Sequence, residues 1–484
     1  MFATNVAKLA ELFPSAVVEG KVNIDLLRTY IGDDVFTDEA YEFTWVGKRA
    51  AIAEAGRPIR KTLRPVRDNE TVLTGADSTD KSYCSSGSKN WDMTENLYIE
   101  GDNLDVLKLL QESYLGKVKM IYIDPPYNTG SDFLYRDNFT VSIDEYDEEA
   151  SVYDEAGNRL VRNTETRGRF HSDWCSMIYP RLVLARNLLS NDGVIFLSID
   201  DNEQENIKKM CNEIMGERNF IAQFIVIRSE GGGLAKQAVI GHDYVIVYAK
   251  NVTTFPSLGK MKEIRGKVVD IAGEAYWIET DWLRKEFGKY GTCPYEEIEM
   301  WHSETKKKEI DNGLKSGKYV LIERGNFRIV GRYRKVADDT SKFYTILKHL
   351  NKNGVEDLTN LKLDNTFDYS KPVSLLKELI LGATIKGNKT DVILDFFSGS
   401  ATTAQAVMQL NAEDDGKRKF IMVQLPEVCA EDTEAAKAGY KNICEIGKER
   451  IRRAGEKIKQ EGGGGNHCRV SMLGSVFSSW MIRT

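Results

Sequence analysis

A short loop whose residue types could do chemistry follows the apolar run at 120–123: Asp124-Pro125-Pro126-Tyr127. The run predicts a buried strand, and open α/β sheets bind ligands at the carboxyl ends of their strands. A carboxylate and a backbone carbonyl can both accept hydrogen bonds from an exocyclic amino group, which directs its lone pair toward an electrophile. Asp124 would supply the carboxylate. Pro125 would supply the carbonyl, because successive prolines hold the backbone in a fixed geometry and donate no competing N–H.

Tyr127, at the end of this loop, is suited to holding a planar base. Its ring can stack on a base that has swung out of a duplex, since an amino group inside the helix is otherwise out of reach. A proline turn after a strand is the simpler explanation of the four residues, but their types and their position together favour a catalytic motif. The predicted catalytic residues are Asp124, Pro125, Pro126 and Tyr127.

A second motif of chemical interest, Asp-Phe-Phe-Ser-Gly-Ser-Ala-Thr-Thr, occupies 395–403. It follows the predicted strand 391–394 and precedes a helix that begins near Thr403. A glycine followed by small residues lets the backbone turn tightly and approach a bound ligand. The motif lacks the further glycines of a dinucleotide fingerprint, and the chain has no Gly-x-x-x-x-Gly-Lys-Ser/Thr loop. NAD and ATP are therefore disfavoured.

Two stretches of the chain supply the elements that must position these motifs. From about 97 to 250 and again from about 368 to 461, short apolar runs alternate with amphipathic helical patterns. This alternation predicts an α/β fold with one doubly wound, Rossmann-like sheet covered by helices on both faces. We expect the strands that end at Ile123 and Leu394 to lie side by side, which would bring the two motifs together.

Overall charge does not point to a nucleic-acid partner. With 66 Lys and Arg against 73 Asp and Glu, the 484 residues carry a net charge of −7. Between 255 and 350 the balance is reversed, with 19 basic and 15 acidic residues, which indicates an inserted basic domain. Among its basic and aromatic residues are Lys306, Lys307, Lys308, Arg324, Arg328, Arg332, Arg334, Lys335, Trp277, Trp282, Trp301, Phe327 and Tyr333. Along 328–334 the arginines are expected to divide between two faces of a strand, so that only some could contact DNA together.

Cysteine spacing and hydropathy narrow the class of protein further. The seven cysteines are scattered singly, without a Cys-x-x-Cys pair, and predict neither a zinc site nor a disulfide framework. No run of eighteen apolar residues occurs, and the N-terminus lacks the pattern of a secretory signal. We therefore expect a cytoplasmic protein with no metal site and no membrane association.

Both ends of the chain have distinctive compositions. The basic run at 57–67 is interrupted by Pro58 and Pro65, which predicts an extended arm that either contacts phosphates or is a solvated linker. At the other end, four glycines at 462–465 are expected to end ordered structure.

The two motifs together resemble the beta group of amino-methyltransferases, in which the catalytic half precedes the cofactor-binding half. The resemblance is closer still to the modification subunits of type III restriction–modification systems, and it covers about 8–460 apart from the basic insert. Further matching stretches are Leu12-Phe13-Pro14, Glu19-Gly20-Lys21, 101–104, 128–130, 174–189, Asp192-Gly193, Lys371-Pro372, Leu375-Leu376 and 424–427.

The resemblance implies transfer of a methyl group from S-adenosylmethionine to adenine N6 in duplex DNA by base flipping. It implies that the methionine and ribose end of the cofactor contacts Asp395, Phe396, Phe397, Gly399, Ser400 and Thr402, with Lys371 and Pro372 beside them. Asp102 would lie against the adenosine end, although it could equally cap a helix at 103–110. Either Gln424 or Glu427 would bind the ribose hydroxyls. Double-stranded DNA, a second copy of the chain and a separate ATP-dependent restriction subunit are the implied partners.

Five segments are predicted on this basis. They are an N-terminal arm or subdomain (1–96), the catalytic half of the methyltransferase domain (97–251), a target recognition domain (252–350), the cofactor-binding half (351–461) and an atypical tail (462–484). The tail departs from the family's pattern, which suggests a frame change or truncation, or else a divergent tail.

Other functions remain open at this stage. Methylation of cytosine N4 uses the same acceptor geometry, but an acidic Asp124 in place of serine favours adenine. A catalytically silent DNA-specificity subunit would have no need of an intact Asp124-Pro125-Pro126-Tyr127 loop. A protein-glutamine methyltransferase also uses a related Pro-Pro-Tyr loop but would not need the basic insert, and RNA is a further possible substrate.

Overall fold

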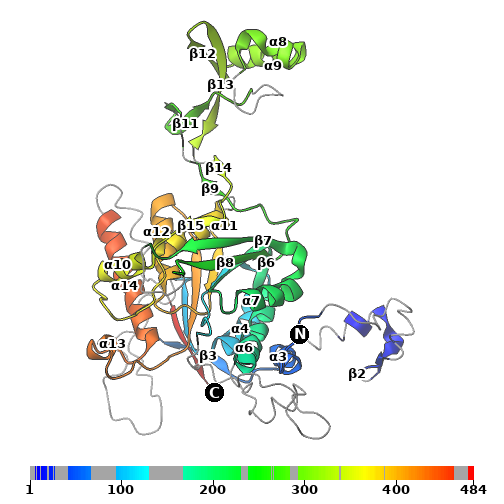
Figure 1. Ribbon diagram of the computed structural model, residues 1–484, viewed down its shortest axis with the longest axis vertical. Helices are drawn as coiled ribbons and strands as arrows, with labels where there is room; N and C mark the ends of the chain where they lie inside the picture. The colour runs from blue at the N-terminus through cyan, green and yellow to red at the C-terminus, as the bar shows by residue number, and fades with distance from the viewer. Residues whose placement is uncertain are drawn as a thin grey trace. The chain divides into compact units, whose positions relative to one another are not determined.

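The computed structural model places one large sheet at the centre of the chain (Figure 1). It describes residues 6, 8–10, 12–18, 21–24, 27, 42–66, 94–129, 167–230, 238–262, 264, 266–283, 293–336, 339–385, 387, 389–462 and 478–483. The chain divides into two compact units, a larger one formed by 1–257 with 344–484 and a smaller one formed by Leu258–Phe343.

Ten strands of the larger unit form the sheet, in the order β15-β7-β8-β6-β5-β16-β17-β4-β18-β3. The five central ones are parallel to one another: β6 (Leu189–Ile199), β5 (Val118–Ile123), β16 (Val392–Asp395), β17 (Lys419–Gln424) and β4 (Leu97–Glu100). Strands β8 (His242–Ala249) and β3 (Thr62–Val66) run antiparallel to their neighbours. Most side chains of the central strands are buried on both faces, as expected for a sheet between two helical layers.

Helices cover the sheet in two groups on opposite faces (Figure 1). One group is α3 (Lys48–Gly56), α4 (Asn103–Tyr114), α6 (Arg167–Leu188) and α7 (Gln204–Cys211). The other is α10 (Asn351–Thr359), α11 (Val373–Thr384), α12 (Thr402–Asp414) and α14 (Ile443–Gly462). The predicted doubly wound α/β fold is therefore confirmed. So is the pairing of the two motif-bearing strands, because β5 and β16 are adjacent, with Ile121 opposite Leu394.

The edges of the sheet contain strands that the sequence analysis did not anticipate. Strand β3 and strand β18 (Ser478–Arg483) pair with each other, and β18 also pairs with β4. Within the predicted extended arm at 57–67, Thr62–Val66 forms strand β3 and belongs to the sheet, so the prediction was wrong for these residues. Residues 57–61 form no strand, and Arg67 lies outside the described residues. The expected end of order at 462–465 was also wrong, because β18 satisfies the backbone groups along the edge of β4. Residues 463–477 lie outside the described residues.

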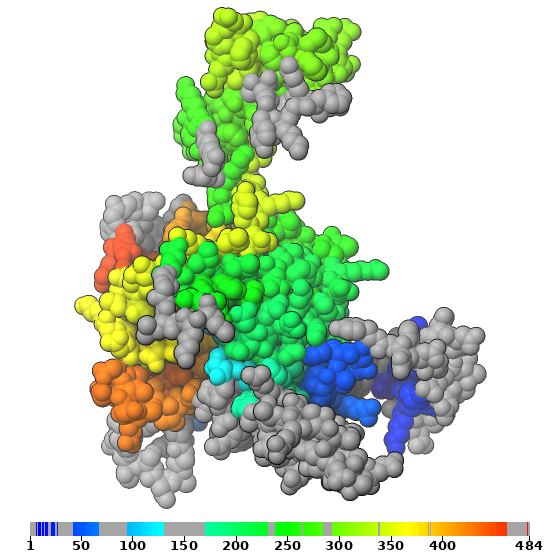
Figure 2. Space-filling view, in the orientation of Figure 1, coloured from blue at the N-terminus to red at the C-terminus, as the bar shows by residue number. Residues whose placement is uncertain are grey.

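Segments on either side of the smaller unit in sequence meet within the larger one. Strand β15 (Ile346–Lys348) pairs in parallel with β7 (Phe220–Ile227), so that residues separated by more than a hundred positions share the sheet edge. In the space-filling view, yellow and green parts of the larger unit, which are far apart in the sequence, accordingly lie against each other (Figure 2). The smaller unit is consequently a little shorter than the predicted segment 252–350.

Among its described residues, the smaller unit contains its own antiparallel sheet, β10-β11-β13-β12, and the helices α8 and α9. These elements are β10 (Val268–Ile271), β11 (Glu274–Glu279), β13 (Phe327–Lys335), β12 (Tyr319–Arg324), α8 (Ile298–Trp301) and α9 (Glu304–Lys315). A cluster that includes Ile298, Ile310 and Val330 forms its core. The unit therefore has a hydrophobic core of its own.

The arginines of β13 share one face of the strand, so the expectation of two faces was wrong. Residues two apart on a strand point the same way, and both Arg332 and Arg334 reach the carboxylate of Glu279. Arg334 also pairs with Asp339, and Arg328 pairs with Glu296. Acidic partners thus offset much of the positive charge that composition alone suggested.

Among the described residues, no helix is both long and apolar enough to cross a bilayer. The same residues include no group of three or more His, Cys, Asp or Glu side chains arranged to hold a metal ion. The five cysteines that they include are free thiols.

Candidate active site

The loops that follow β5 and β16 open into one pocket of the larger unit. Its lining includes six of the predicted site residues: Asp124, Lys371, Asp395, Phe397, Ser400 and Thr402. The other lining residues are Tyr122, Phe367, Tyr369, Ser370, Leu376, Ser398 and Thr403. Because parallel strands end at the same edge, two motifs more than 250 positions apart share this pocket.

Asp124 presents a partly exposed carboxylate to this pocket. Its side chain is 23% exposed, and its Oδ1 accepts a hydrogen bond from the hydroxyl of Tyr127 at 2.9 Å. The carbonyl of Pro126 is already engaged, because the indole N–H of Trp174 donates to it at 2.7 Å. Among the described residues, the carbonyl of Pro125 accepts no hydrogen bond. The loop thus offers an amino group two acceptors, one carboxylate and one free carbonyl.

Lys371 lies beside Asp124 and Tyr127. Its ammonium is 3.2 Å from Asp124 Oδ1, donates a hydrogen bond to the hydroxyl of Tyr127 and lies 4.8 Å from the centre of the Tyr127 ring. Burial raises the pKa of the Tyr127 hydroxyl well above its usual value, so this group stays protonated. Lys371, predicted from the resemblance as a cofactor neighbour, therefore also stabilises the charge of Asp124.

Asp243 is a site residue that sequence reasoning missed. Its carboxylate is almost fully buried on β8, 3.9 Å from Lys371 and 2.9 Å from Arg228. Burial raises the pKa of Asp243, while Lys371 and Arg228 oppose the shift. The only sequence signal was an acidic residue at the start of the apolar run 244–248. It was uninformative without knowing that β8 pairs beside β6.

The glycine loop after β16 turns through a backbone conformation that favours glycine. Gly399 has a φ of +48°, and a Cβ at this position would lie 3.2 Å from the ring of Phe367. Its N–H donates to the side-chain oxygen of Gln424 at 2.7 Å. Gln424 therefore holds the loop in place. Glu427 is half-buried, and its carboxylate has no partner among the described residues.

Asp395 is buried at the floor of the pocket. Its carboxylate accepts hydrogen bonds from Thr403 Oγ1 at 2.6 Å and from the backbone N–H of Phe397 at 3.2 Å. Burial raises the pKa of Asp395 to about 7, and the nearby charge of Asp124 adds to the shift. A cation entering the pocket would stabilise the ionised form.

Six of the predicted cofactor residues do not line the pocket: Asp102, Pro372, Phe396, Gly399, Gln424 and Glu427. Phe396, Asp102 and Pro372 have structural roles. Phe396 is fully buried in the core, and its carbonyl accepts a hydrogen bond from Asn103 at 2.8 Å. Asp102 caps α4 by accepting from the N–H of Leu104 at 2.8 Å. Pro372 is the N-cap residue of α11. The predicted alternative for Asp102, a helix cap, is thus present.

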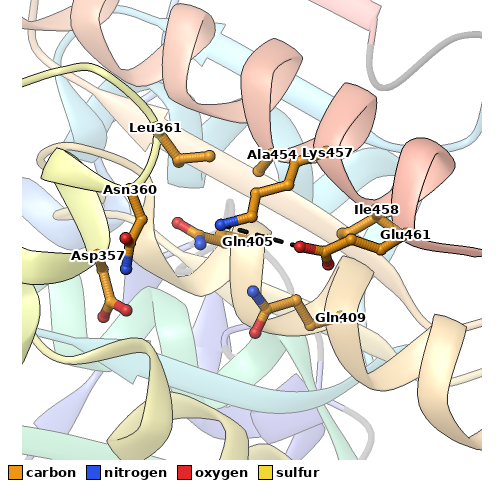
Figure 3. A pocket seen from close by; sticks show the side chains of 9 residues that line it. All are labelled: Asp357, Asn360, Leu361, Gln405, Gln409, Ala454, Lys457, Ile458 and Glu461. Atoms are coloured by element: carbon orange, nitrogen blue, oxygen red, sulfur yellow. Dashed lines mark ion pairs between the residues drawn. The ribbon is translucent and has the colours of Figure 1, made fainter.

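A second pocket lies between α10, α12 and α14 (Figure 3). Its polar lining includes Asp357, Gln405 and Gln409, and Lys457 and Glu461, one turn apart on α14, form an ion pair at 3.9 Å along one wall. It includes none of the predicted site residues, and its charged groups mostly have partners within the wall. The first pocket is therefore the candidate active site.

Comparisons with known proteins show the family to which the chain belongs. The family described as DNA methylase matches residues 118–454, which include both motifs. The chain is 34% identical over 453 residues to the type III restriction-modification enzyme StyLTI Mod subunit of Salmonella typhimurium, covering 87% of this chain and 63% of that protein. It is 31% identical over 476 residues to the EcoPI Mod subunit of Escherichia phage P1, covering 87% of this chain and 69% of that protein. Among solved structures, the PvuII DNA methyltransferase (cytosine-N4-specific) is 12% identical, covers 77% of this chain and 95% of its own, and has a TM-score of 0.37.

Proposed function

The chain belongs to the DNA methylase family that includes the type III restriction–modification Mod subunits, and on that premise we propose that it methylates adenine N6 in duplex DNA, using S-adenosylmethionine. The observation that carries the proposal is the shared pocket of Asp124 and the glycine loop. One wall presents acceptors for an amino group, and the other presents a tight backbone turn with a buried acid beside it.

The residues of the Asp124 loop prepare the amino group for attack. The carboxylate of Asp124 and the carbonyl of Pro125 accept its two hydrogen bonds, which directs the nitrogen lone pair out of the base plane. Tyr127 stacks on the flipped base. While the amino group is hydrogen-bonded to Asp124, the ammonium of Lys371 can pair with a second carboxylate. This is the carboxylate of Asp243, which lies 3.9 Å from the ammonium. The bound cofactor supplies the methyl group.

The residues of the second wall fit such a cofactor. The turn at Gly399 admits close approach of a ligand to the backbone, and Asp395 offers a buried carboxylate to a cation. Glu427 is a better acceptor for ribose hydroxyls than Gln424, because the amide oxygen of Gln424 already accepts from Gly399. Asp102 can contact the adenosine end while it caps α4, since its side chain is 26% exposed.

Cofactor affinity should fall as the pH is lowered through 7. Asp395 has a pKa of about 7, so its carboxyl carries a proton at lower pH. A cation that requires the ionised form must then displace this proton. We therefore expect S-adenosylhomocysteine to bind roughly tenfold more weakly at pH 6 than at pH 7.5. Isothermal titration calorimetry measures the change. Asp395→Asn should remove most of this pH dependence, and an equal pH dependence in the variant would contradict the assignment.

The direct test of the proposed function is a methylation assay. The purified chain is incubated with duplex DNA and cofactor, and the product is sequenced for modified bases. N6-methyladenine at a fixed sequence supports the proposal. Modification of cytosine N4 favours the alternative target base, and absence of DNA modification despite cofactor binding favours a silent specificity subunit.

We further propose that the smaller unit reads the target sequence and that two copies of the chain act together. Duplex DNA is polyanionic, and the exposed basic side chains of this unit are suited to phosphate contacts.

The larger unit has no phosphate-binding Gly-Lys-Ser/Thr loop, so DNA cleavage would require a separate ATP-dependent restriction subunit. Action on DNA also implies a cytoplasmic location. Light scattering with and without DNA measures the mass, and a fully active monomer would rule out the dimer.

A further inference from the structure

The Asp124 loop (124–127) is followed by a residue in a backbone conformation that most side chains avoid. Asn128, directly after Tyr127, has a φ of +58°. Asparagine enters this left-handed region more readily than most residues, but such a conformation persists only where the surroundings hold it. The amide nitrogen of Asn128 donates to the carbonyl of Phe170 at 3.2 Å and to Glu203 Oε1 at 2.5 Å. The end of the loop is therefore held by two different parts of the chain.

Glu203 is a fully buried carboxylate whose oxygens contact several polar side chains. Besides its bond with Asn128, Oε1 lies 2.6 Å from Nδ1 of His171, and Oε2 accepts a hydrogen bond from Asn206 at 2.7 Å. Burial raises the pKa of Glu203, and the hydrogen bonds from Asn206 and Asn128 oppose the shift. The ionised carboxylate is the form that suits these neighbours, because it only accepts hydrogen bonds.

The carboxylate of Glu203 does not cap its own helix. Glu203 is the N-cap residue of α7, but within the part of the chain that the structure describes its side chain makes no capping hydrogen bond. A capping side chain accepts from a backbone N–H two or three positions later. Oε1 instead faces Asn128 and His171, which belong to the loop and to α6. Helix capping therefore does not explain a buried carboxylate at this position.

Helix α6 anchors the same loop at two points. The indole N–H of Trp174 donates to the carbonyl of Pro126 at 2.7 Å, and the carbonyl of Phe170 accepts from Asn128 at 3.2 Å. The residues on both sides of Tyr127 are thus fixed by hydrogen bonds. A further anchor comes from a different element, the N-terminus of α7, and it acts on the residue with the left-handed backbone.

We propose that Glu203 is a positioning residue for methyl transfer, which through Asn128 fixes the backbone after Tyr127 and so holds the ring on which the target base stacks. The inference rests on the proposed function, because it presumes a flipped base at Tyr127. Glu203 is fully buried and acts through Asn128. A displacement of about 1 Å in a group that positions the substrate can lower a rate by about a hundredfold.

Two single variants and their combination test this role in the full-length chain. Asn128→Gly removes the hydrogen bond but allows the left-handed backbone without strain, and Glu203→Ala removes the acceptor. Each should lower kcat for methylation of duplex DNA by about tenfold to a hundredfold. The dissociation constant of S-adenosylhomocysteine should stay within about twofold of wild type. A merely structural role would lower the midpoint of chemical denaturation and leave kcat per folded molecule unchanged, which would overturn the inference.

The double variant shows whether Glu203 acts through Asn128. Because both changes break the same hydrogen bond, the double variant should be only about twofold to threefold slower than the slower single variant. Losses that multiply in the double variant would show independent effects and overturn the inference. Gln204→Ala is the matched control, since it removes a side-chain hydrogen bond to Gln223 from the neighbouring position of α7 and should leave kcat unchanged.

Glu203→Gln is the conservative variant, should Glu203→Ala fail to fold. Its amide oxygen can still accept from Asn128, so kcat should lie within about fivefold of wild type. A loss in Glu203→Gln as large as that in Asn128→Gly would show that the hydrogen bond is not what matters and would overturn the inference. Wild-type kcat in Asn128→Gly would also overturn it and leave the proposed function intact. Absence of methyl transfer by the wild type would instead remove the proposed function, and this inference with it.

Discussion

Methyl transfer should fall by about a hundredfold to a thousandfold or more when Asp124 is replaced by alanine, with little change in cofactor affinity. The carboxylate lines the pocket, accepts a hydrogen bond from Tyr127 and forms an ion pair with Lys371. Its proposed role is toward the target amino group, whereas other residues that line the pocket, such as Asp395, are proposed to face the cofactor. The loss should therefore appear in kcat for DNA methylation. It should not appear in the dissociation constant for S-adenosylhomocysteine.

Two further variants, Asp124→Asn and Asp364→Ala, serve as comparisons for Asp124→Ala. Asp124→Asn keeps one acceptor oxygen but loses the charge that Lys371 pairs with, so its activity should lie between those of wild type and Asp124→Ala. Asp364→Ala removes an exposed carboxylate and should leave both constants unchanged. Turnover within a few-fold of wild type in Asp124→Ala would exclude the proposed mechanism.

Trp174→Ala should have the largest effect on stability. The indole is fully buried in the core beneath the catalytic loop, and its N–H donates to the carbonyl of Pro126 at 2.7 Å. Removing the ring leaves a large cavity and an unpaired carbonyl, which together should lower the free energy of unfolding by about 3–5 kcal/mol. Chemical denaturation with the fluorescence of the remaining tryptophans measures the difference.

Trp174→Phe separates the packing role from the positioning role. The phenyl ring fills most of the space, but the hydrogen bond to the loop is lost, which should lower stability by only about 1–2 kcal/mol. Because that bond fixes the carbonyl next to Asp124, kcat should fall more than stability alone accounts for. Trp45→Phe is the matched control, since the indole of Trp45 donates to Ser176 at 2.9 Å on the same helix. Equal kcat in the two phenylalanine variants would show that the Trp174 bond does not position the loop.

The sequence by itself determined the fold class, the two motifs and the family. Asp124 and the 395–403 loop each follow a short apolar run, and a pattern of this kind depends only on neighbouring residues. The adjacency of β5 and β16 also followed, because few sheet topologies place two such loops where one ligand could bridge them. The family match over 118–454 confirms the resemblance that these stretches suggested.

Only the tertiary structure decided which side chains surround the motifs. Asp243 reaches Lys371 across the sheet, and Arg450 reaches Ser370 from a helix 80 positions away. Strand β18 pairs with β3 and β4, which come more than 370 positions earlier in the chain. The arginines of β13 pair with acidic residues on neighbouring elements. No local pattern encodes these contacts. They arise when long-range strand pairing and helix packing bring distant residues together, and the hydrogen bonds and charge pairs of a buried site depend on those partners.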